Sequence, residues 1–199
     1  MKSLHRPDLF AWSSFDEARN VDFSGTLWRR RDGNVLFDPM PLTDHDLAHA
    51  HELGGVAWIA ITNADHVRAA AELAVVFGAK LAAPAGDRER PDLDGVPVAL
   101  WLEDGDEFLG ARVIGMQGSK TPGELAFLLG DTLLCGDLVR GQRAGSLNLL
   151  PDPKLADKAA AVASVARLAD LGPSAVLVGD GQSVFRDGEA RLRDLLASI

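Results

Sequence analysis

Three short segments of the sequence end an apolar stretch with an aspartate that could bind a cation or move a proton. They are Asp65-His66, Gly136-Asp137 and Gly179-Asp180-Gly181. A carboxylate in such a place commonly closes a turn or caps a helix, and each segment alone allows that interpretation. Three of them together, one with a histidine, favour a shared site. Carboxylate and imidazole groups bind divalent metals, and a carboxylate can also act as a general base.

The elements around these segments would place all three at strand ends. The apolar run from Val56 to Ile61 predicts a buried strand, and a helical pattern follows from Val67 to Phe77. Apolar runs at Thr132–Cys135 and Ala175–Val178 predict the strands that precede the other two segments. Loops at the carboxyl ends of strands are where α/β sheets place their chemistry, so we expect the site there.

The rest of the chain predicts further strands and helices. Strands are expected at Leu9–Phe15, Val21–Arg30, Val35–Phe37, Lys80–Ala83, Val98–Leu102, Arg112–Met116 and Leu125–Leu129, and helices at Thr43–Leu53, Lys154–Leu171 and Arg186–Leu196. The segment Arg140–Pro151 is interpreted as a basic loop containing glycine. No repeat or linker interrupts the pattern, so we expect residues 1–199 to form a single domain of two mixed sheets covered by helices.

Composition limits the class of protein. The formal charge of −9 argues against nucleic acid or an anionic membrane as a partner. Cys135 is the only cysteine, which excludes an intrachain disulfide and a cysteine metal cage. No apolar run approaches the roughly 20 residues that span a membrane, and the first residues lack the apolar core of a signal peptide. We therefore expect a cytoplasmic protein, and a homodimer stays open.

Four motifs occur in an order that resembles the metallo-β-lactamase-fold hydrolases, which include glyoxalase II-like thioesterases, lactonases and lactamases. They are T-N-A-D-H at 62–66, G-S-K-T-P-G-E at 118–124, L-L-C-G-D-L-V at 133–139 and V-L-V-G-D-G at 176–181. The family carries H-x-H-x-D-H, G-H-T-x-G, a strand ending in Gly-Asp, and a late Gly-His-Gly at these places. The resemblance spans roughly Gly25 to the C-terminus. It implies a four-layer αββα sandwich and a hydrolase that uses metal ions.

Most of the metal ligands that the resemblance implies are replaced. Asp65-His66 matches the final D-H of the first motif, and Asp137 matches the bridging aspartate. Ile61-Thr62-Asn63 stands where the family has H-x-H, and Lys120 stands at the histidine of G-H-T. Asp180 takes the place of the late histidine. One implied metal therefore loses all three of its histidines, whereas the other keeps three of four ligand positions and gains a carboxylate at the fourth.

Two interpretations of this cluster stay open, because three aspartates and one lysine leave a net charge of −2 that something must neutralise. In the first, one divalent metal binds Asp65, His66, Asp137 and Asp180, with Lys120 where the other metal would lie. This hard ligand set would favour Mn²⁺, Fe²⁺ or Mg²⁺ over Zn²⁺. In the second no metal binds, and Lys120 with a protonated His66 bridges the three aspartates.

Two functions follow from these interpretations. The first is a hydrolase of a small ester, thioester, lactone or phosphoester, with a metal-bound water as nucleophile and Asp65 as proton acceptor. Lys120, Arg140 and Arg143 would then hold an anionic or carbonyl substrate. The second is a catalytically inactive relative that binds a ligand or a partner. Loss of every ligand of one metal argues against ordinary lactamase or glyoxalase II activity, and whether the chain is an enzyme stays open.

Overall fold

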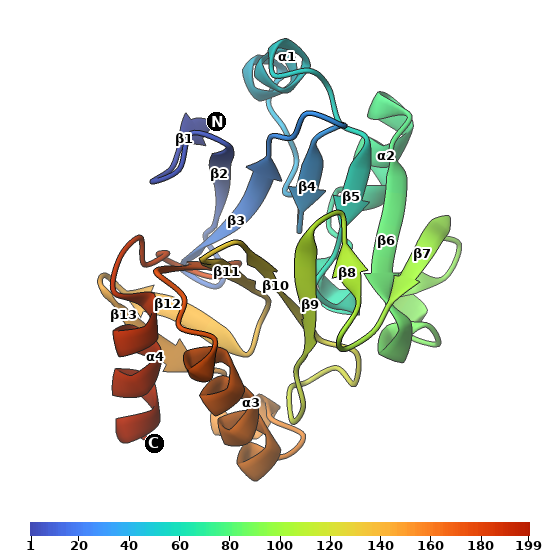
Figure 1. Ribbon diagram of the computed structural model, residues 1–199. Helices are drawn as coiled ribbons and strands as arrows, with labels where there is room; N and C mark the ends of the chain where they lie inside the picture. The colour runs from blue at the N-terminus through green and yellow to red at the C-terminus, as the bar shows by residue number, and fades with distance from the viewer.

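The computed structural model describes residues 1–199 as two β-sheets packed face to face, with helices on both outer faces (Figure 1). The first sheet runs in chain order: β1 (Lys2–Ser3), β2 (Leu9–Asp16), β3 (Val21–Trp28), β4 (Val35–Phe37), β5 (Trp58–Ala60), β6 (Lys80–Pro84) and β7 (Val98–Leu102). The second has the order β14 (Ala175–Val178), β11 (Thr132–Cys135), β10 (Leu125–Leu129), β9 (Ala111–Gly115) and β8 (Glu107–Phe108). The predicted αββα sandwich is confirmed.

Two pairs of helices form the outer layers. Helices α1 (Asp44–Glu52) and α2 (Ala70–Phe77) cover the first sheet, and α3 (Lys158–Asp170) and α4 (Gly188–Ala197) cover the second (Figure 1). Thr43 begins α1 as predicted, because its side chain accepts a hydrogen bond from the backbone N–H of Asp46. None of these helices combines the length and the apolar character that a membrane span requires.

The buried apolar side chains divide into three clusters that hold the four layers together. Phe37, Phe108 and Phe127 lie between the two sheets. The other two clusters lie under the helices, with Ile59 and Leu73 on the first sheet side, and Leu133 and Val165 among those on the second. Because apolar burial is the main stabilising term of folding, these layers form a firm scaffold for the loops at the strand ends.

One expected loop is wrong, and the largest shifts of an expected helix boundary are at the starts of α2 and α3. The segment predicted as a basic loop is a hairpin of β12 (Val139–Arg143) and β13 (Ser146–Leu149), in which Val139 and Leu149 are buried partners. The alternation of Leu147 and Leu149 with polar residues satisfies the period of a strand, but the arginines obscured it. Helix α2 begins at Ala70 rather than Val67, because a 3₁₀ turn at Ala64–His66 and a positive φ of 41° at Arg68 come first. Helix α3 begins at Lys158, after the capping residue Asp157.

The strand pairing brings the predicted segments together. Strands β11 and β14 run parallel with Cys135 beside Val178, so Gly136-Asp137 and Gly179-Asp180 leave the second sheet side by side. Strands β4 and β5 are also parallel, with Phe37 beside Ala60, so Asp38 emerges next to the turn that carries His66. The backbone N–H of Ser24 in β3 donates to the carbonyl of Gly179 at 2.8 Å and joins the first sheet to the segment that follows β14. The site thus lies where both sheets end.

Candidate functional site

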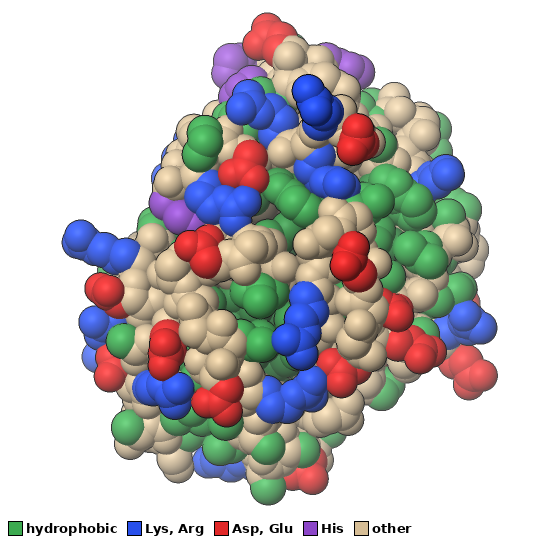
Figure 2. All heavy atoms as spheres, viewed as in Figure 1, with side chains coloured by type: hydrophobic (Ala, Val, Ile, Leu, Met, Phe, Trp, Pro, Cys, Tyr) green, Lys and Arg blue, Asp and Glu red, His purple; other side chains and the backbone are tan.

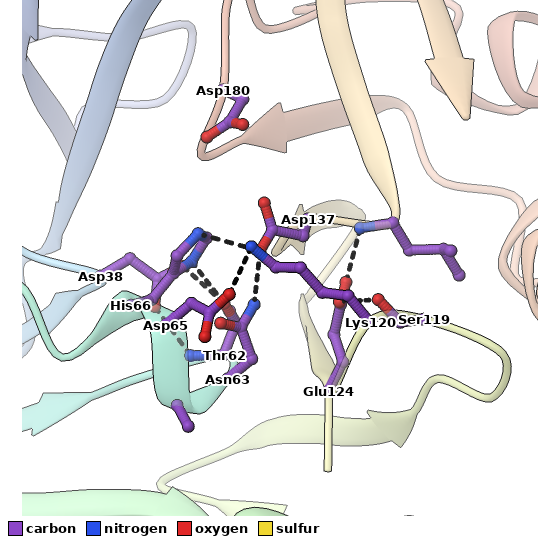
Figure 3. A network of polar contacts seen from close by, with 12 residues as sticks. Asp38, Thr62, Asn63, Asp65, His66, Ser119, Lys120, Glu124, Asp137 and Asp180 are labelled. Carbon is purple, nitrogen blue, oxygen red and sulfur yellow. Dashed lines mark hydrogen bonds and ion pairs between the residues drawn. The ribbon is translucent and has the colours of Figure 1, made fainter. Parts of the chain in front are cut away.

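Lys120 lies at the centre of the polar cluster, between two carboxylates (Figure 3). Its Nζ is 2.6 Å from Oδ2 of Asp65 and 2.6 Å from Oδ2 of Asp137. Asp137 is buried, whereas Asp65 has a side chain 31% exposed at the rim. Burial disfavours the ammonium, but the two carboxylates more than offset it and raise the pKa of Lys120. Lys120 therefore remains a cation.

Arg140 joins the two Gly-Asp segments. Its Nη2 lies 2.9 Å from Oδ1 of Asp137 and 2.6 Å from Oδ2 of Asp180, and its Nε donates to the carbonyl of Asp137. The side chain comes from β12, which lies beside the loops that follow β11 and β14. A guanidinium presents several donors in a fixed plane, so it can satisfy two carboxylates at once.

His66 forms the buried end of the cluster. Its Nδ1 is 2.8 Å from Oδ2 of Asp38, and its Nε2 is 3.5 Å from Oδ2 of Asp137. Burial disfavours the imidazolium, but the charge of Asp38 outweighs that cost and the pKa of His66 rises to about 9. Asp38 is fixed in turn because it accepts hydrogen bonds from the N–H and the hydroxyl of Thr62, both at 2.7 Å.

Arg68 lies against the Nε2 edge of the His66 ring. Its Nη1 donates to the carbonyls of Ser24 and Asp38, which hold the guanidinium in place. Its Nη2 lies 3.3 Å from Nε2 of His66 and 3.6 Å from Oδ1 of Asp180. That oxygen of Asp180 has no hydrogen-bond partner although it is buried.

Positive and negative groups balance in the assembled site. Its four aspartates are Asp38, Asp65, Asp137 and Asp180, and its four cations are Arg68, Lys120, Arg140 and the imidazolium of His66. The sequence alone indicates −2 because that count leaves out Asp38, Arg68 and Arg140 and takes His66 as neutral. These eight groups sum to zero before the buried acids Asp87 and Glu124 are counted, so side chains of the chain itself offset the four aspartates.

Two further buried acids tie the loops of the site to one another. Asp87 accepts hydrogen bonds from the backbone N–H groups of Ala64 and Gly123, both at 2.7 Å. Glu124 accepts one from the N–H of Leu138 at 2.7 Å and another from the hydroxyl of Ser119. Burial and the nearby charge of Asp137 raise the pKa of Glu124 to about 7. These bonds fix Lys120 relative to Asp65 and Asp137.

The glycines that precede Asp137 and Asp180 lie very close to other residues of the site. A Cβ at Gly136 would lie 2.6 Å from Oγ1 of Thr62, and one at Gly179 would lie 3.1 Å from Cε1 of His66. A side chain at Gly136 would therefore push apart the two sheet ends that form the site. The Gly-Asp pattern in the sequence reflects this packing.

The cluster opens into a cavity of about 940 Å³. Arg19, Phe23, Met40 and Lys154 line it together with the site residues. Figure 2 shows acidic and basic side chains interspersed over the face seen in Figure 1, without an extended patch of one charge. The cavity is thus lined by several cations together with the carboxylates that pair with them.

The predicted site residues mostly converge. The structure brings together Asp65, His66, Lys120, Asp137, Arg140 and Asp180. Arg143 lies elsewhere, exposed at the far end of β12 and beside Arg191 in a separate cavity.

Four residues of the site were missed by sequence reasoning: Asp38, Arg68, Asp87 and Glu124. Asp38 follows the strand at Val35–Phe37 directly, so the strand-end pattern could have found it. Glu124 lies in the quoted G-S-K-T-P-G-E motif. Arg68 and Asp87 carry no comparable local signal.

The residues do not fit a divalent metal of the kind that the resemblance implies. His66, Asp137 and Asp180 offer ligand atoms within 4.8 Å of one another, and Asp65 lies outside that group. These ligand atoms already have cationic partners within the protein. Asp137 contacts both Lys120 and Arg140, and Asp180 contacts Arg140. The guanidinium of Arg68 lies next to Nε2 of His66. A metal among them would meet fixed positive charges at close range, which is costly in a buried site.

Comparisons with known proteins agree with this architecture. A family model described as metallo-β-lactamase superfamily matches residues 1–199. Among solved structures, a metallo-β-lactamase family protein of Thermus thermophilus is 20% identical with a TM-score of 0.71, covering 97% of this chain and 79% of its own. DIM-1 metallo-β-lactamase is 16% identical with a TM-score of 0.75, covering 97% and 94%. An archaeal superfamily protein of Sulfolobus tokodaii is 20% identical with a TM-score of 0.67, covering 88% and 79%.

Identities this low show the fold alone, and no curated protein matches the sequence. The family model carries more weight because it covers every residue of the chain. The order of the four motifs and the αββα layers point the same way. The chain belongs to the metallo-β-lactamase superfamily.

Proposed function

We propose that this chain is a metal-independent member of the superfamily that binds a small anionic molecule and does not hydrolyse it. The observation that carries the proposal is the position of Lys120, whose Nζ is 2.6 Å from both Asp65 and Asp137. Arg140 makes the same kind of link between Asp137 and Asp180. Lys120 and Arg140 thus supply positive charge to the three aspartates. This favours the metal-free ion-pair network over a site with one metal and hydrolase activity.

The protonation states also favour binding over hydrolysis. Hydrolysis without a metal needs a base whose pKa lies near the working pH. His66, with a pKa of about 9, is already protonated at neutral pH and cannot accept a proton. Burial raises the pKa of Asp137, but His66 and Lys120 bring it well below its usual range, so Asp137 is a weak base. Glu124 has a suitable pKa of about 7, but its two oxygens already accept from Leu138 and Ser119.

The cavity favours an anionic ligand of small-molecule size. Its volume of about 940 Å³ lies in the range of ligand pockets, which is roughly 300–1,000 Å³. Lys120, Arg68 and Arg140 reach it from the site, and ammonium and guanidinium groups bind carboxylates and phosphates strongly. Phe23 and Met40 add a short apolar wall for the remainder of such a ligand.

Metal analysis combined with calorimetry tests the proposal. Protein purified without a histidine tag or chelator should contain less than stoichiometric metal. Mn²⁺, Fe²⁺, Mg²⁺ and Zn²⁺ should leave its Tm unchanged, since a ligand raises Tm only if it binds the folded state. Titration with inorganic phosphate should release or absorb heat with a saturable isotherm. About one metal per chain with a matching rise in Tm would overturn the proposal and favour the mononuclear hydrolase.

A matched pair of variants locates the bound anion. Lys120→Met should abolish the phosphate isotherm because it removes the central ammonium. Lys158→Met should leave it unchanged, since Lys158 is exposed on α3 and pairs only with Asp152 at 2.9 Å. Equal isotherms for both variants would show that phosphate binds away from the site.

A further inference from the structure

The two carboxylates on Lys120 are held very differently. Asp137 is buried and is also contacted by Arg140 at 2.9 Å, His66 at 3.5 Å and Asn63 at 3.3 Å. Asp65 is at the rim of the cavity, and its one other partner is Arg90 at 3.5 Å. The carboxylate of Asp137 is therefore held firmly against Lys120, whereas the carboxylate of Asp65 is held by few contacts and can be replaced by another anion.

The side chain of Asp65 can leave Lys120 without moving the backbone. The 3₁₀ turn at Ala64–His66 is fixed on both sides, because Ala64 donates to Asp87 and His66 is held by Asp38. Rotation about the side-chain bonds of Asp65 would be enough to release the ammonium. Arg90, with a side chain 39% exposed, offers the released carboxylate a second partner.

We infer that Asp65 occupies the place of the ligand's own anionic group on Lys120, and that a carboxylate or phosphate of the ligand displaces it. The inference rests on the proposed function and names the atom that the anionic group contacts, Nζ of Lys120. The exchange replaces one anion by another on the same ammonium, so Asp137 keeps its partner and the buried network stays balanced. Arg68 and Arg140 line the same cavity and supply donors for further oxygens of the ligand.

This arrangement makes Asp65 an internal competitor. A tethered group competes at an effective concentration on the order of millimolar. Simple anions that contact Lys120 alone should therefore bind weakly, and ligands with additional groups for the cavity should be selected. Asp65 would thus determine specificity as well as affinity.

Calorimetric titrations with sodium acetate and with inorganic phosphate test this inference on four folded proteins, checked by circular dichroism. Asp65→Asn should tighten binding of both anions by about tenfold, which corresponds to about 1.4 kcal/mol. Asp94→Asn is the matched control, because it removes the same charge from an exposed position of the neighbouring loop, outside the lining of the cavity, and leaves the contact between Asp65 and Lys120 intact. Its affinity should stay within about twofold of the wild type, since exposed charges are screened. The double variant Lys120→Met, Asp65→Asn should not show the tighter anion binding that is expected for Asp65→Asn alone.

Each outcome separates the inference from the function on which it rests. Equal tightening by Asp65→Asn and Asp94→Asn would show a general charge effect and overturn the inference while anion binding stands. Unchanged or weaker binding by Asp65→Asn would also overturn it, because a competitor would then be absent. No binding of either anion to the wild type or to any variant would overturn the proposed function itself.

Discussion

Asp38 and His66 form a buried ion pair, with Oδ2 2.8 Å from Nδ1, although they lie at the ends of different strands. The folded protein holds the proton of His66 more tightly than the unfolded chain, because the pKa rises from 6.5 to about 9. This contribution to stability is fully present below pH 6.5 and is lost as the pH rises through 9. The pair links proton binding directly to folding.

The first prediction is a fall in the free energy of unfolding between pH 6.5 and 9, of at most roughly 3 kcal/mol. Urea denaturation at a series of pH values measures it. A His66→Gln variant has no imidazole to titrate, so its stability should be lower at pH 6.5 and should depend less on pH across this interval. A wild type whose stability is flat from pH 6.5 to 9 would show that His66 is neutral in the folded state.

The second prediction concerns Glu124, whose pKa rises from 4.5 to about 7 on folding. Above pH 7 the folded protein contains a buried anion facing Asp137, whereas below pH 4.5 the carboxyl is neutral in both states. Glu124→Gln should therefore raise the free energy of unfolding at pH 8 by about 1–3 kcal/mol and change it little at pH 4.5. The amide keeps an acceptor for Leu138 and offers Ser119 a donor. Destabilisation at both pH values would show that Glu124 is needed as a carboxylate.

The third prediction is that Asp137→Asn destabilises the protein. Asp137 contacts Lys120 and Arg140 directly and faces His66, so its loss leaves three cations close together with one fewer anion. Breaking a buried ion pair commonly costs about 3–5 kcal/mol. Asp152→Asn provides the control, because its pair with Lys158 is exposed and should be worth about 0–1 kcal/mol. Thermal melts of both variants and of the wild type measure these changes in stability. A Tm of Asp137→Asn above that of the wild type would show that repulsion among the aspartates dominates.

The sequence predicted the strand-end acids because their signal is local. Asp137 and Asp180 each follow a buried strand and a glycine, and that pattern is visible without a structure. The parallel pairing of β11 with β14 places the two carboxylates side by side, but pairing depends on contacts between segments that are distant in the sequence. The strands and the order of the motifs could therefore be predicted, whereas the spacing between the acids could not.

The charge balance of the site was not predictable for a similar reason. The sequence predicts that Arg140 holds a substrate from a basic loop, because the pairing of a buried arginine with Asp137 and Asp180 has no local sequence signal. Arg68 enters the site only because the chain takes a positive φ there and delays the start of α2. The count of cations from the sequence therefore omitted Arg68 and Arg140, both of which pair with carboxylates of the site.

The last prediction concerns Asp87, which is fully buried and holds both loops that carry Asp65 and Lys120. Asp87→Ala leaves the N–H groups of Ala64 and Gly123 without acceptors, and each unsatisfied buried group costs about 1–3 kcal/mol. Stability should fall, and phosphate affinity should fall with it because the loop that carries Lys120 is no longer fixed relative to Arg68 and Arg140 in the same cavity. Asp94→Ala, at an exposed position of the following loop, should change neither quantity. Chemical denaturation measures the change in stability, and calorimetry on the same preparations measures the change in phosphate affinity. A loss of stability with unchanged phosphate affinity would show that Asp87 stabilises the fold without positioning the site.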